Sequence, residues 1–185
     1  LAAQASPSLS FEAPRKTFEI NLLGTLEIFQ TIRNIRHQNS QFNPRIIVTG
    51  SVDEYGPVPV EQLPITEESQ FHPNNPYAIS KVATYYLSKQ YTDAYQLDIM
   101  YLSPFNQIGP GQMPGFFIPD MCSQIVLIEQ HQQAACIKTG NLDARRDFVD
   151  VRDVARAYER ALISGKSGSR YNLCSGKSYS MKEIL

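Results

Sequence analysis

Short apolar runs alternate with segments of helical periodicity along this chain, and that alternation limits the fold more than any other feature. Residues 45–49 and 97–102 are apolar runs too short for stable helices. Apolar residues at helical spacing precede and separate them, over about 14–36 and again from Pro76. Strands buried on both faces have this continuous apolar pattern, and helices connect such strands in parallel sheets. The sequence therefore predicts an α/β fold with a mainly parallel sheet.

The second part of the chain continues the alternation. Four elements are predicted there: a helix near 120–129, a strand near 136–138, a helix over about 151–164 that begins after Asp150, and a strand over 170–174. Two long segments rich in glycine and proline, 50–75 and 103–119, show no periodicity and follow predicted strands. Because ligands bind beyond the carboxyl ends of parallel strands, we expect the active site between these loops.

Composition excludes several classes of protein. The 17 Lys and Arg residues balance 18 Asp and Glu residues, so the chain has no basic surface for nucleic acid. No apolar run reaches the length of about 18 residues that a membrane-spanning helix needs. The cysteines, 3 in number and far apart, form neither a disulfide framework nor a metal cluster. We predict a cytoplasmic protein that binds neither a metal ion nor a membrane.

The two ends of the sequence suggest an internal piece of a longer chain. The first residues are Leu-Ala-Ala, with no methionine and no signal peptide pattern. Near the other end, Ser180 and Glu183 form a capping box, so a helix begins where only two residues remain. We expect the 185 residues alone to be inactive.

Tyr77 and Lys81 are the first candidates for chemistry. They are four residues apart at the start of the second helix, so they share one helix face. An ammonium near a phenol stabilises the phenolate and lowers a pKa that starts near ~10, which suits proton transfer. Tyr85 and Lys89 have the same spacing but lie two turns further along the helix, away from the strand ends. Ser51 directly follows a predicted strand and could contact the same oxygen as Tyr77.

These residues carry a resemblance to a known family. Ser51, with Tyr77 and Lys81 in Pro-Tyr-Ala-Ile-Ser-Lys, resembles the catalytic set of the short-chain dehydrogenase/reductase superfamily. Further motifs resemble its extended branch, the NAD-dependent epimerase/dehydratase family, and within it the GDP-6-deoxy-4-keto-mannose reductases. They are Leu1-Ala-Ala-Gln4, Asn21-Leu-Leu-Gly-Thr25, Gly50-Ser-Val-Asp-Glu-Tyr-Gly56, Pro104-Phe-Asn-Gln-Ile-Gly-Pro-Gly-Gln112 and the run from Gly140 to Asp153. Ser103 departs from the pattern, since relatives often carry arginine there.

The resemblance implies a partial Rossmann-like doubly wound sheet with part of a smaller C-terminal substrate-binding region. Residues 1–102 would form the second half of the dinucleotide-binding domain, with the catalytic residues. Residues 103–185 would hold the mixed-sheet return and part of the nucleotide-sugar-binding region. The family's glycine-rich phosphate loop and the residue that selects NAD or NADP precede the first residue given, so either cofactor fits.

The resemblance also assigns roles to residues. Ser51, Tyr77 and Lys81 would be catalytic, and Asp53 stands two positions after the serine, where related 4,6-dehydratases carry an acid/base glutamate. Contacts to the cofactor would come from Leu1, Ala2 and Ala3, together with Tyr77 and Lys81. Contacts to the substrate would come from Asn106, Asn141 and Arg146. Two alternatives stay open: Asn106 as a turn-forming residue and Arg146 as a solvated loop charge. Asn21 would support the active-site backbone or a water relay, or be a polar helix position.

The implied function is an NAD(P)-dependent oxidoreductase that reduces a GDP-4-keto-6-deoxy-mannose-type sugar at C4 and works as a homodimer. One alternative is a GDP-mannose 4,6-dehydratase or a nucleotide-sugar 4-epimerase. Asp53 is one methylene shorter than the dehydratase glutamate, which favours the reductase without excluding the dehydratase. A further alternative is a non-catalytic α/β binding module that retains the motifs by descent.

Overall fold

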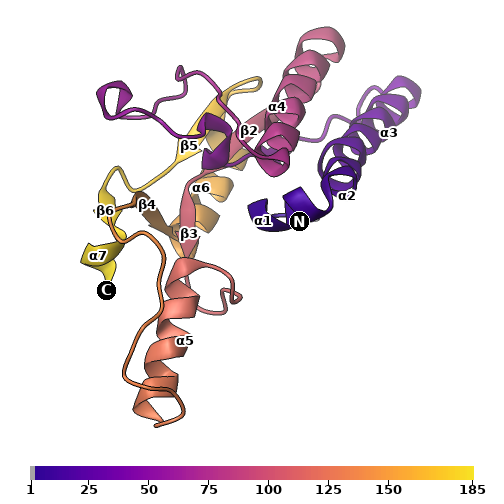
Figure 1. Ribbon diagram of the computed structural model, residues 1–185. Helices are drawn as coiled ribbons and strands as arrows, with labels where there is room; N and C mark the ends of the chain where they lie inside the picture. Colours follow the sequence, from indigo (N-terminus) through magenta and orange to yellow (C-terminus); the bar gives the residue numbers. More distant parts are fainter. Residues whose placement is uncertain (1–2) are drawn as a thin grey trace. The chain divides into compact units, whose positions relative to one another are not determined.

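Strand β2 (Ile99–Pro104) is the centre of the main sheet, and all of its residues are buried. Strands β1 (Ile46–Thr49) and β5 (Arg170–Leu173) pair with it in parallel on either side (Figure 1). The prediction of an α/β fold with a parallel sheet is confirmed. The apolar run of β2 follows from its position, because a central strand covered on both faces leaves no place for a solvated side chain.

This computed structural model describes residues 3–185, which fall into two compact units. The first unit contains the described residues up to Pro104 together with Arg156–Leu173. The second contains Phe105–Ala155 together with Cys174–Leu185. The functional roles expected for 1–102 and 103–185 stay a prediction.

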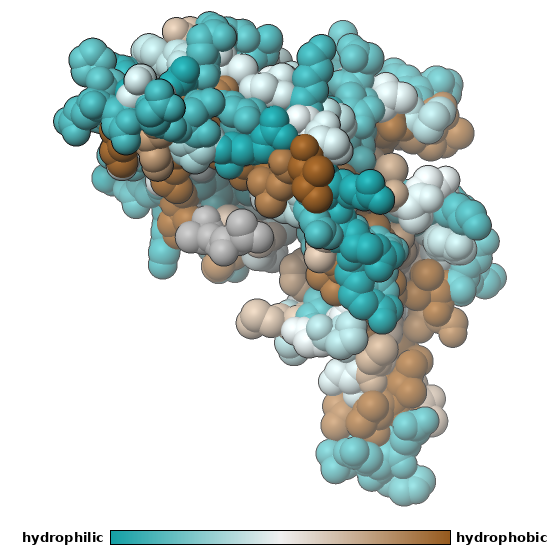
Figure 2. Space-filling model, turned by 180° about the vertical axis from the view of Figure 1, so that it is seen from behind, coloured by the Kyte–Doolittle hydropathy of each residue, from teal (hydrophilic) through white to brown (hydrophobic). Residues whose placement is uncertain are grey.

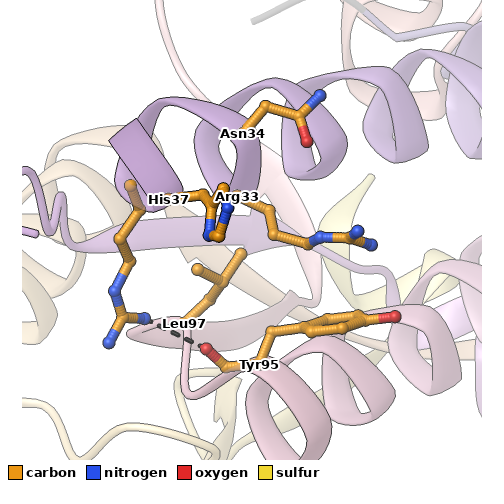
Figure 3. A pocket seen from close by; sticks show the side chains of 6 residues that line it. Arg33, Asn34, His37, Tyr95 and Leu97 are labelled. Atoms are coloured by element: carbon orange, nitrogen blue, oxygen red, sulfur yellow. Dashed lines mark hydrogen bonds between the residues drawn. The ribbon is translucent and has the colours of Figure 1, made fainter. Parts of the chain in front are cut away.

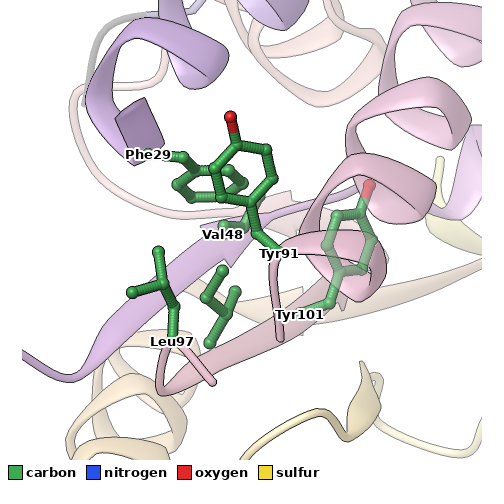
Figure 4. Packing of buried hydrophobic residues seen from close by; sticks show 6 residues of the cluster. Phe29, Val48, Tyr91, Leu97 and Tyr101 are labelled. Carbon is green, nitrogen blue, oxygen red and sulfur yellow. The ribbon is translucent and has the colours of Figure 1, made fainter. Parts of the chain in front are cut away.

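Helices cover one face of the main sheet. The helical segments before β1 are α1 (Pro7–Glu12), α2 (Pro14–Phe18), the π-helical η1 (Glu19–Leu23) and α3 (Gly24–Gln38), and α4 (Pro76–Tyr95) follows β1. Phe29 of α3 and Tyr91 of α4 pack with Val48, Leu97 and Tyr101 in one hydrophobic cluster (Figure 4). Figure 1 shows α3 beside α4, as their contacts require.

The other face of the same sheet carries a second cluster. Met100 and Leu102 of β2 pack against Ala161 of α6 (Val151–Ser164), the helix predicted over about 151–164. The Asp150 carboxylate accepts a hydrogen bond from the Arg152 backbone N–H at 2.8 Å, in the manner of an N-cap. Side chains of β2 thus alternate between two cores, which fixes the strand's register.

Helix α4 buries only part of its apolar stripe, of which Leu87 packs against the first cluster. Its apolar stripe includes Ile79 and Tyr86, which are 44% and 59% exposed. The buried residues of this helix are instead Tyr77, Ala78, Ser80, Lys81, Thr84, Ser88 and Tyr91. Buried hydroxyls on it are satisfied within the helix, as when Thr84 Oγ1 donates to the Ser80 carbonyl oxygen at 2.7 Å.

The second unit contains a small mixed sheet. Strand β3 (Asn106–Ile108) pairs in parallel with β4 (Arg145–Asp150), and β4 pairs antiparallel with β6 (Ser178–Ser180). The unit also contains α5 (Phe117–Glu129) and α7 (Met181–Ile184), and α7 begins at the predicted Ser180–Glu183 capping box. Figure 2 shows hydrophobic residues along α5, at the bottom of the view, and Ile125 and Val126 are among its exposed residues.

Two predictions for this unit were wrong. Residues 103–119 are not irregular throughout, because they contain β3. Residues 136–138 form no strand, since Lys138 instead makes hydrogen bonds with the side chain of Gln124. Strand β4 was missed because its sequence, Arg-Arg-Asp-Phe-Val-Asp, is charged and mostly half-exposed, so no apolar run marks it.

No helix among residues 3–185 is both long and apolar enough to cross a lipid bilayer.

The segment from 50 to 75 is irregular apart from two short 3-10 turns, η2 (Val52–Tyr55) and η3 (Val60–Gln62). The second predicted strand is confirmed as β2 with its bounds shifted to Ile99–Pro104, and the last one as β5.

Replacement of Gly50 by alanine tests the packing at the end of β1. A Cβ atom there would lie 2.5 Å from Glu54 Oε1 and 2.8 Å from Tyr101 Cζ, both of them buried. We expect Gly50→Ala to lower the free energy of unfolding by about 1–3 kcal/mol through overpacking, measured by denaturant titration. The control is Gly24→Ala, whose nearest contact would be 3.8 Å away, and which should be neutral or stabilising. Equal effects at both positions would contradict the expectation.

Candidate active site

Ser51 lies where β1 ends and η2 begins, and its backbone is fixed on both sides. Its hydroxyl oxygen accepts a hydrogen bond from the Asp53 backbone N–H at 3.2 Å, and its own N–H donates to Glu54 Oε1 at 2.7 Å. This reciprocal pair is a capping box around a 3-10 turn. The serine is therefore held at the carboxyl end of a parallel strand, where the sequence predicts the active site.

Tyr77 and Lys81 come from the first turns of α4. Asn75 caps this helix by accepting a hydrogen bond from the Ala78 N–H at 2.8 Å, and Pro76 begins it. Lys81 Nζ donates to the Thr49 carbonyl oxygen at 2.9 Å and lies 5.7 Å from the centre of the Tyr77 ring. The structure thus brings the lysine, the tyrosine and the end of β1 together.

The pKa of Tyr77 shifts in the opposite direction to the one that the sequence predicts. Burial raises the pKa of Tyr77 to about 12, the hydrogen bond with Ser51 opposes this rise, and Asp53 and Glu54 add to it. Burial also lowers the pKa of Lys81. The sequence instead predicted a lowered pKa for the tyrosine. At neutral pH the phenol is therefore protonated, which prepares it to donate a proton rather than to accept one.

Glu54 is a residue of the site that the sequence analysis did not assign. It is fully buried, and its carboxyl oxygens contact the Ser51 N–H, the Tyr101 hydroxyl and the Ser103 hydroxyl at 2.7, 2.7 and 3.1 Å. Burial raises the pKa of Glu54 to about 7 against these hydrogen bonds and Lys81. Asp53, the acid predicted to act in catalysis, is only half-buried. A glutamate next to a predicted catalytic aspartate was the signal available in the sequence.

The long loop after η2 is fastened to the main sheet through Arg170 of β5. The Arg170 guanidinium lies 4.3 Å from the centre of the Phe71 ring and 5.1 Å from that of Tyr85. Glu67 Oε1 accepts a hydrogen bond from the backbone N–H of Asn172 at 2.7 Å. These contacts hold the loop against the sheet before α4 begins. No periodic pattern in the sequence predicts them.

Asn21 lies in the π-helical segment η1 and joins two parts of the first unit. Its side chain accepts a hydrogen bond from Gln4 N–H at 2.9 Å and donates to the Gln4 carbonyl oxygen and to Ser80 Oγ, each at 3.0 Å. π-helical turns within helices occur often at functional sites. Of the three readings from sequence, these contacts support the first, in which Asn21 holds backbone beside the site.

The residues expected to hold a nicotinamide dinucleotide are only partly described. Leu1 and Ala2 lie outside the described residues, and Ala3 is exposed. Tyr77 and Lys81 fit the sugar of such a cofactor by their chemistry. The ammonium has three N–H donors, of which the Thr49 carbonyl takes one in the described part of the chain, and sugar hydroxyls accept such bonds.

The residues expected to bind substrate belong to the second unit. Asn106 donates from Nδ2 to the Asp147 carbonyl oxygen at 3.1 Å. Asn141 is exposed, and its side chain accepts a hydrogen bond from the Asp143 N–H at 2.9 Å, which makes it a turn residue here. Arg146 is exposed and donates to the Arg145 carbonyl oxygen at 2.8 Å. Their roles in substrate binding stay predictions.

The second pair at the same spacing has structural contacts instead. The Tyr85 ring packs edge-on against Phe71 and Tyr101, and Lys89 forms an exposed ion pair with Asp93. Within residues 3–185, the ring and ion-pair contacts of Tyr85 and Lys89 involve Phe71, Tyr101 and Asp93 rather than Ser51. Context at the helix start, rather than spacing, therefore separates the Tyr77 and Lys81 pair from this one.

A pocket of about 390 Å³ lies far from this site. Arg33, Arg36, His37 and Tyr95 are among the residues that line it, at the C-terminal ends of α3 and α4 (Figure 3). Arg36 donates to the carbonyl oxygens of Tyr95 and Gln96, so it satisfies the end of α4. Tyr95 is roughly 27 Å along the helix from Tyr77 at the usual rise per residue, so the pocket is not part of the catalytic site.

A parallel sheet with a serine at a strand end, and a tyrosine and a lysine one turn apart on the next helix, defines the short-chain dehydrogenase/reductase class. The sequence model of one extended family of that class, GDP-mannose 4,6 dehydratase, matches residues 1–185. The chain belongs to this family.

Individual relatives agree with this assignment. GDP-6-deoxy-D-mannose reductase of Pseudomonas aeruginosa is 39% identical over 185 residues, which are 100% of this chain and 59% of that protein. The structure of RMD from Pseudomonas aeruginosa complexed with NADPH has a TM-score of 0.92 at 39% identity, over 100% of this chain and 61% of that one. The structure of UDP-N-acetylglucosamine 4-epimerase from Methanobrevibacter ruminantium, in complex with UDP-N-acetylmuramic acid, has a TM-score of 0.84 at 26% identity. The match covers 100% of this chain and 56% of that one. The chain spans about three fifths of these relatives.

Substitution of Asn21 tests its bridging role. Asn21→Ala removes the partners of the Gln4 backbone and of Ser80, so we expect the free energy of unfolding to fall by about 1–3 kcal/mol. Thermal or denaturant unfolding of the complete protein measures this loss. Asn34→Ala, at an exposed position of α3, is the control and should change stability by less than about 0.5 kcal/mol. Equal stability of the two variants would show that the bridge contributes nothing.

Proposed function

We propose that the protein containing this chain is an NAD(P)-dependent nucleotide-sugar oxidoreductase that reduces a GDP-4-keto-6-deoxy-mannose-type substrate at C4. The observation that carries this proposal is the buried Tyr77 phenol, protonated at neutral pH, with Ser51 and Lys81 beside it. The 39% identity to a GDP-6-deoxy-D-mannose reductase supports the same choice of substrate.

The tyrosine and the serine would act on one oxygen of the sugar. As C4 is reduced, its carbonyl oxygen becomes an alkoxide, and Tyr77 transfers its phenolic proton to that oxygen. The raised pKa keeps the phenol protonated until a strong base forms next to it. The Ser51 hydroxyl donates a hydrogen bond to the same oxygen and stabilises the developing charge. The fixed backbone of Ser51 keeps this donor in place.

Lys81 would bind the cofactor and support the tyrosine. The nicotinamide cofactor supplies the hydride. Lys81 lies against the Tyr77 ring with a buried ammonium, so it stabilises the phenolate left after proton transfer and donates to sugar hydroxyls of the cofactor. NADPH in the RMD structure supports a nicotinamide dinucleotide without deciding between NAD and NADP for this chain.

Residues of the second unit would bind the nucleotide sugar. The exposed guanidinium of Arg146 suits the diphosphate because its planar donors match phosphate oxygens. Asn106 and Asn141 would contact the substrate beside it. Asp147 supports this region, since its carboxylate accepts hydrogen bonds from the N–H groups of Ser175 and Gly176 at 2.9 and 2.8 Å.

The second candidate is a 4,6-dehydratase, for which Asp53 would be the additional acid or base. Its carboxylate raises the pKa of Tyr77, so its charge acts on that phenol. Loss of water from a sugar needs an acid or base in addition to the tyrosine, and the half-buried Asp53 would supply it. The name of the family agrees with this alternative as well.

We further propose a homodimer in a reducing, cytoplasmic compartment. The exposed apolar side chains Ile28 of α3 and Ile79 and Tyr86 of α4 support a second copy packed on these helices. The thiols of Cys122 and Cys136 are exposed, and an odd number of cysteines cannot all pair within one chain, which supports a reducing compartment.

Tyr77→Phe removes the proposed proton donor with little change in shape. We expect reduction by the complete protein to fall by about a hundredfold or more while nucleotide-sugar affinity stays nearly unchanged, because only proton transfer needs the hydroxyl. Steady-state kinetics and calorimetric titration measure the two quantities. Tyr85→Phe is the control and should be close to neutral. A Tyr77→Phe enzyme that keeps most of its kcat would refute the mechanism.

Product analysis separates the candidate functions in the same assay. A reductase converts the 4-keto-6-deoxy derivative and leaves GDP-mannose unchanged, whereas a dehydratase converts GDP-mannose. Cofactor binding without turnover of either sugar would favour a non-catalytic module and contradict the proposal.

Tyr86→Arg tests the proposed dimer. Tyr86 is 59% exposed on α4, so a charge there should not disturb the fold but should be costly in an apolar interface. Light scattering of the complete protein at micromolar concentration should give a dimer for the wild type and a monomer for this variant. Val60→Arg, at an 82% exposed position of η3, should remain dimeric. A monomeric wild type rules the dimer out.

A further inference from the structure

Glu54 lies between two parts of the candidate catalytic set, Ser51 at the end of β1 and Lys81 on α4. Its Oε1 atom accepts the Ser51 N–H on the strand side. The Tyr101 hydroxyl lies 2.7 Å from the same Oε1 and 2.7 Å from the Lys81 carbonyl oxygen on the helix side. Figure 4 shows the Tyr101 ring reaching from β2 toward α4. A chain of contacts thus runs from the serine backbone through Glu54 and Tyr101 to the lysine backbone.

The number of protons available to these hydrogen bonds indicates the charge state of Glu54. Tyr101 has one hydroxyl proton, yet its oxygen lies at hydrogen-bond distance from two acceptor oxygens. If Glu54 is ionised, one of these close oxygen pairs has no proton between its atoms. If Glu54 is a neutral acid, it donates to Tyr101, and Tyr101 donates to Lys81. Only the neutral acid places a proton between the atoms of both pairs, and two buried oxygen atoms 2.7 Å apart repel each other when no proton lies between them.

We propose that Glu54 is a positioning residue that is held as a neutral carboxylic acid and whose proton links Ser51 to the backbone of Lys81. Its ionisation turns the Tyr101 proton toward the carboxylate, so the Lys81 carbonyl oxygen loses its side-chain partner. The link between β1 and α4 is then broken. Because Glu54 is fully buried, it would act on the reaction through Ser51 and Lys81.

Several polar and charged groups surround this acid. Lys81 of α4 favours the ionised form, although in the described part of the chain no salt bridge joins the two and the ammonium donates to Thr49. Tyr101 and Ser103 of β2 and the Ser51 N–H contact the carboxyl group directly. Asp53 and Glu54 both raise the pKa of Tyr77, and Arg170 of β5 opposes the rise in the pKa of Tyr101. Complete burial outweighs the favourable contacts, in agreement with a pKa of about 7.

Two measurements on the complete protein test the charge state without substrate. Infrared spectra at about pH 6, below the pKa of Glu54, should contain a carbonyl band of a protonated carboxyl that Glu54→Gln removes and the exposed control Glu61→Gln retains. The folded state holds a proton that the unfolded state releases above its ordinary pKa, so stability is lost as pH rises. The melting temperature of the wild type should therefore fall relative to Glu54→Gln between about pH 5 and about pH 8. Parallel melting curves, or no such band, would overturn the proposal.

Tyr101→Phe is a second variant, which tests the proposal even if the Glu54→Gln protein does not fold. Without the tyrosine hydroxyl, the neutral acid loses its acceptor, so its carbonyl band should move to higher frequency. Tyr91→Phe, another buried tyrosine, is the matched control and should leave the band in place. A band that Tyr101→Phe does not move would show that the protonated carboxyl is not on Glu54, and the proposal would be wrong.

A third measurement concerns positioning and rests on the proposed function. With the reductase assay, the ratio of kcat for Glu54→Gln to kcat for the wild type should rise between about pH 6 and about pH 8, with little change in KM. A purely structural residue would lower kcat by a factor independent of pH, and that result would refute the positioning role. If the wild type reduces no nucleotide sugar, the proposed function fails, while the infrared and melting results still decide the state of Glu54.

Discussion

The turn at the end of β1 depends on one buried capping interaction. The Ser51 N–H donates to the Glu54 carboxyl, and this side chain packs directly against Gly50 and Tyr101. The turn redirects the chain within a few residues, so that a serine hydroxyl remains at the strand end while the loop leaves the sheet. The geometry of the candidate site follows from this, since Lys81 is fixed against the Thr49 carbonyl just before the same turn.

The sequence predicts the main sheet well because its strands obey a simple rule. A central strand covered on both faces, such as β2, must be apolar throughout, and the run is visible without any knowledge of its partners. The small sheet obeys no such rule. Strand β4 pairs through its backbone while its charged side chains stay largely in solvent, so neither apolar content nor alternation marks it. Its detection needs the partner strands β3 and β6, which are distant in sequence.

The same distinction applies to the candidate site. Ser51, Tyr77 and Lys81 could be assigned because neighbouring residues in the sequence indicate the strand end and the helix start at which they lie. Asn21 contacts Ser80, and Glu54 contacts Tyr101 in addition to its neighbour Ser51. Only the fold brings these distant partners together. In helix α4 the apolar pattern misidentifies part of the buried face: Ile79 and Tyr86 are exposed, whereas Lys81 and several hydroxyls are buried.

Burial of the site favours one direction of proton transfer. The same desolvation raises the pKa of Tyr77 and lowers that of Lys81, so it favours the neutral form of each group. A neutral phenol serves a reaction in which negative charge develops on a substrate oxygen, since the proton is already on the donor when the charge forms. A reaction that begins by removing a proton from a sugar hydroxyl needs the phenolate, and this environment makes that ion costly. The Asp53 carboxylate increases this cost further, which agrees with the proposed role of Tyr77 as a proton donor.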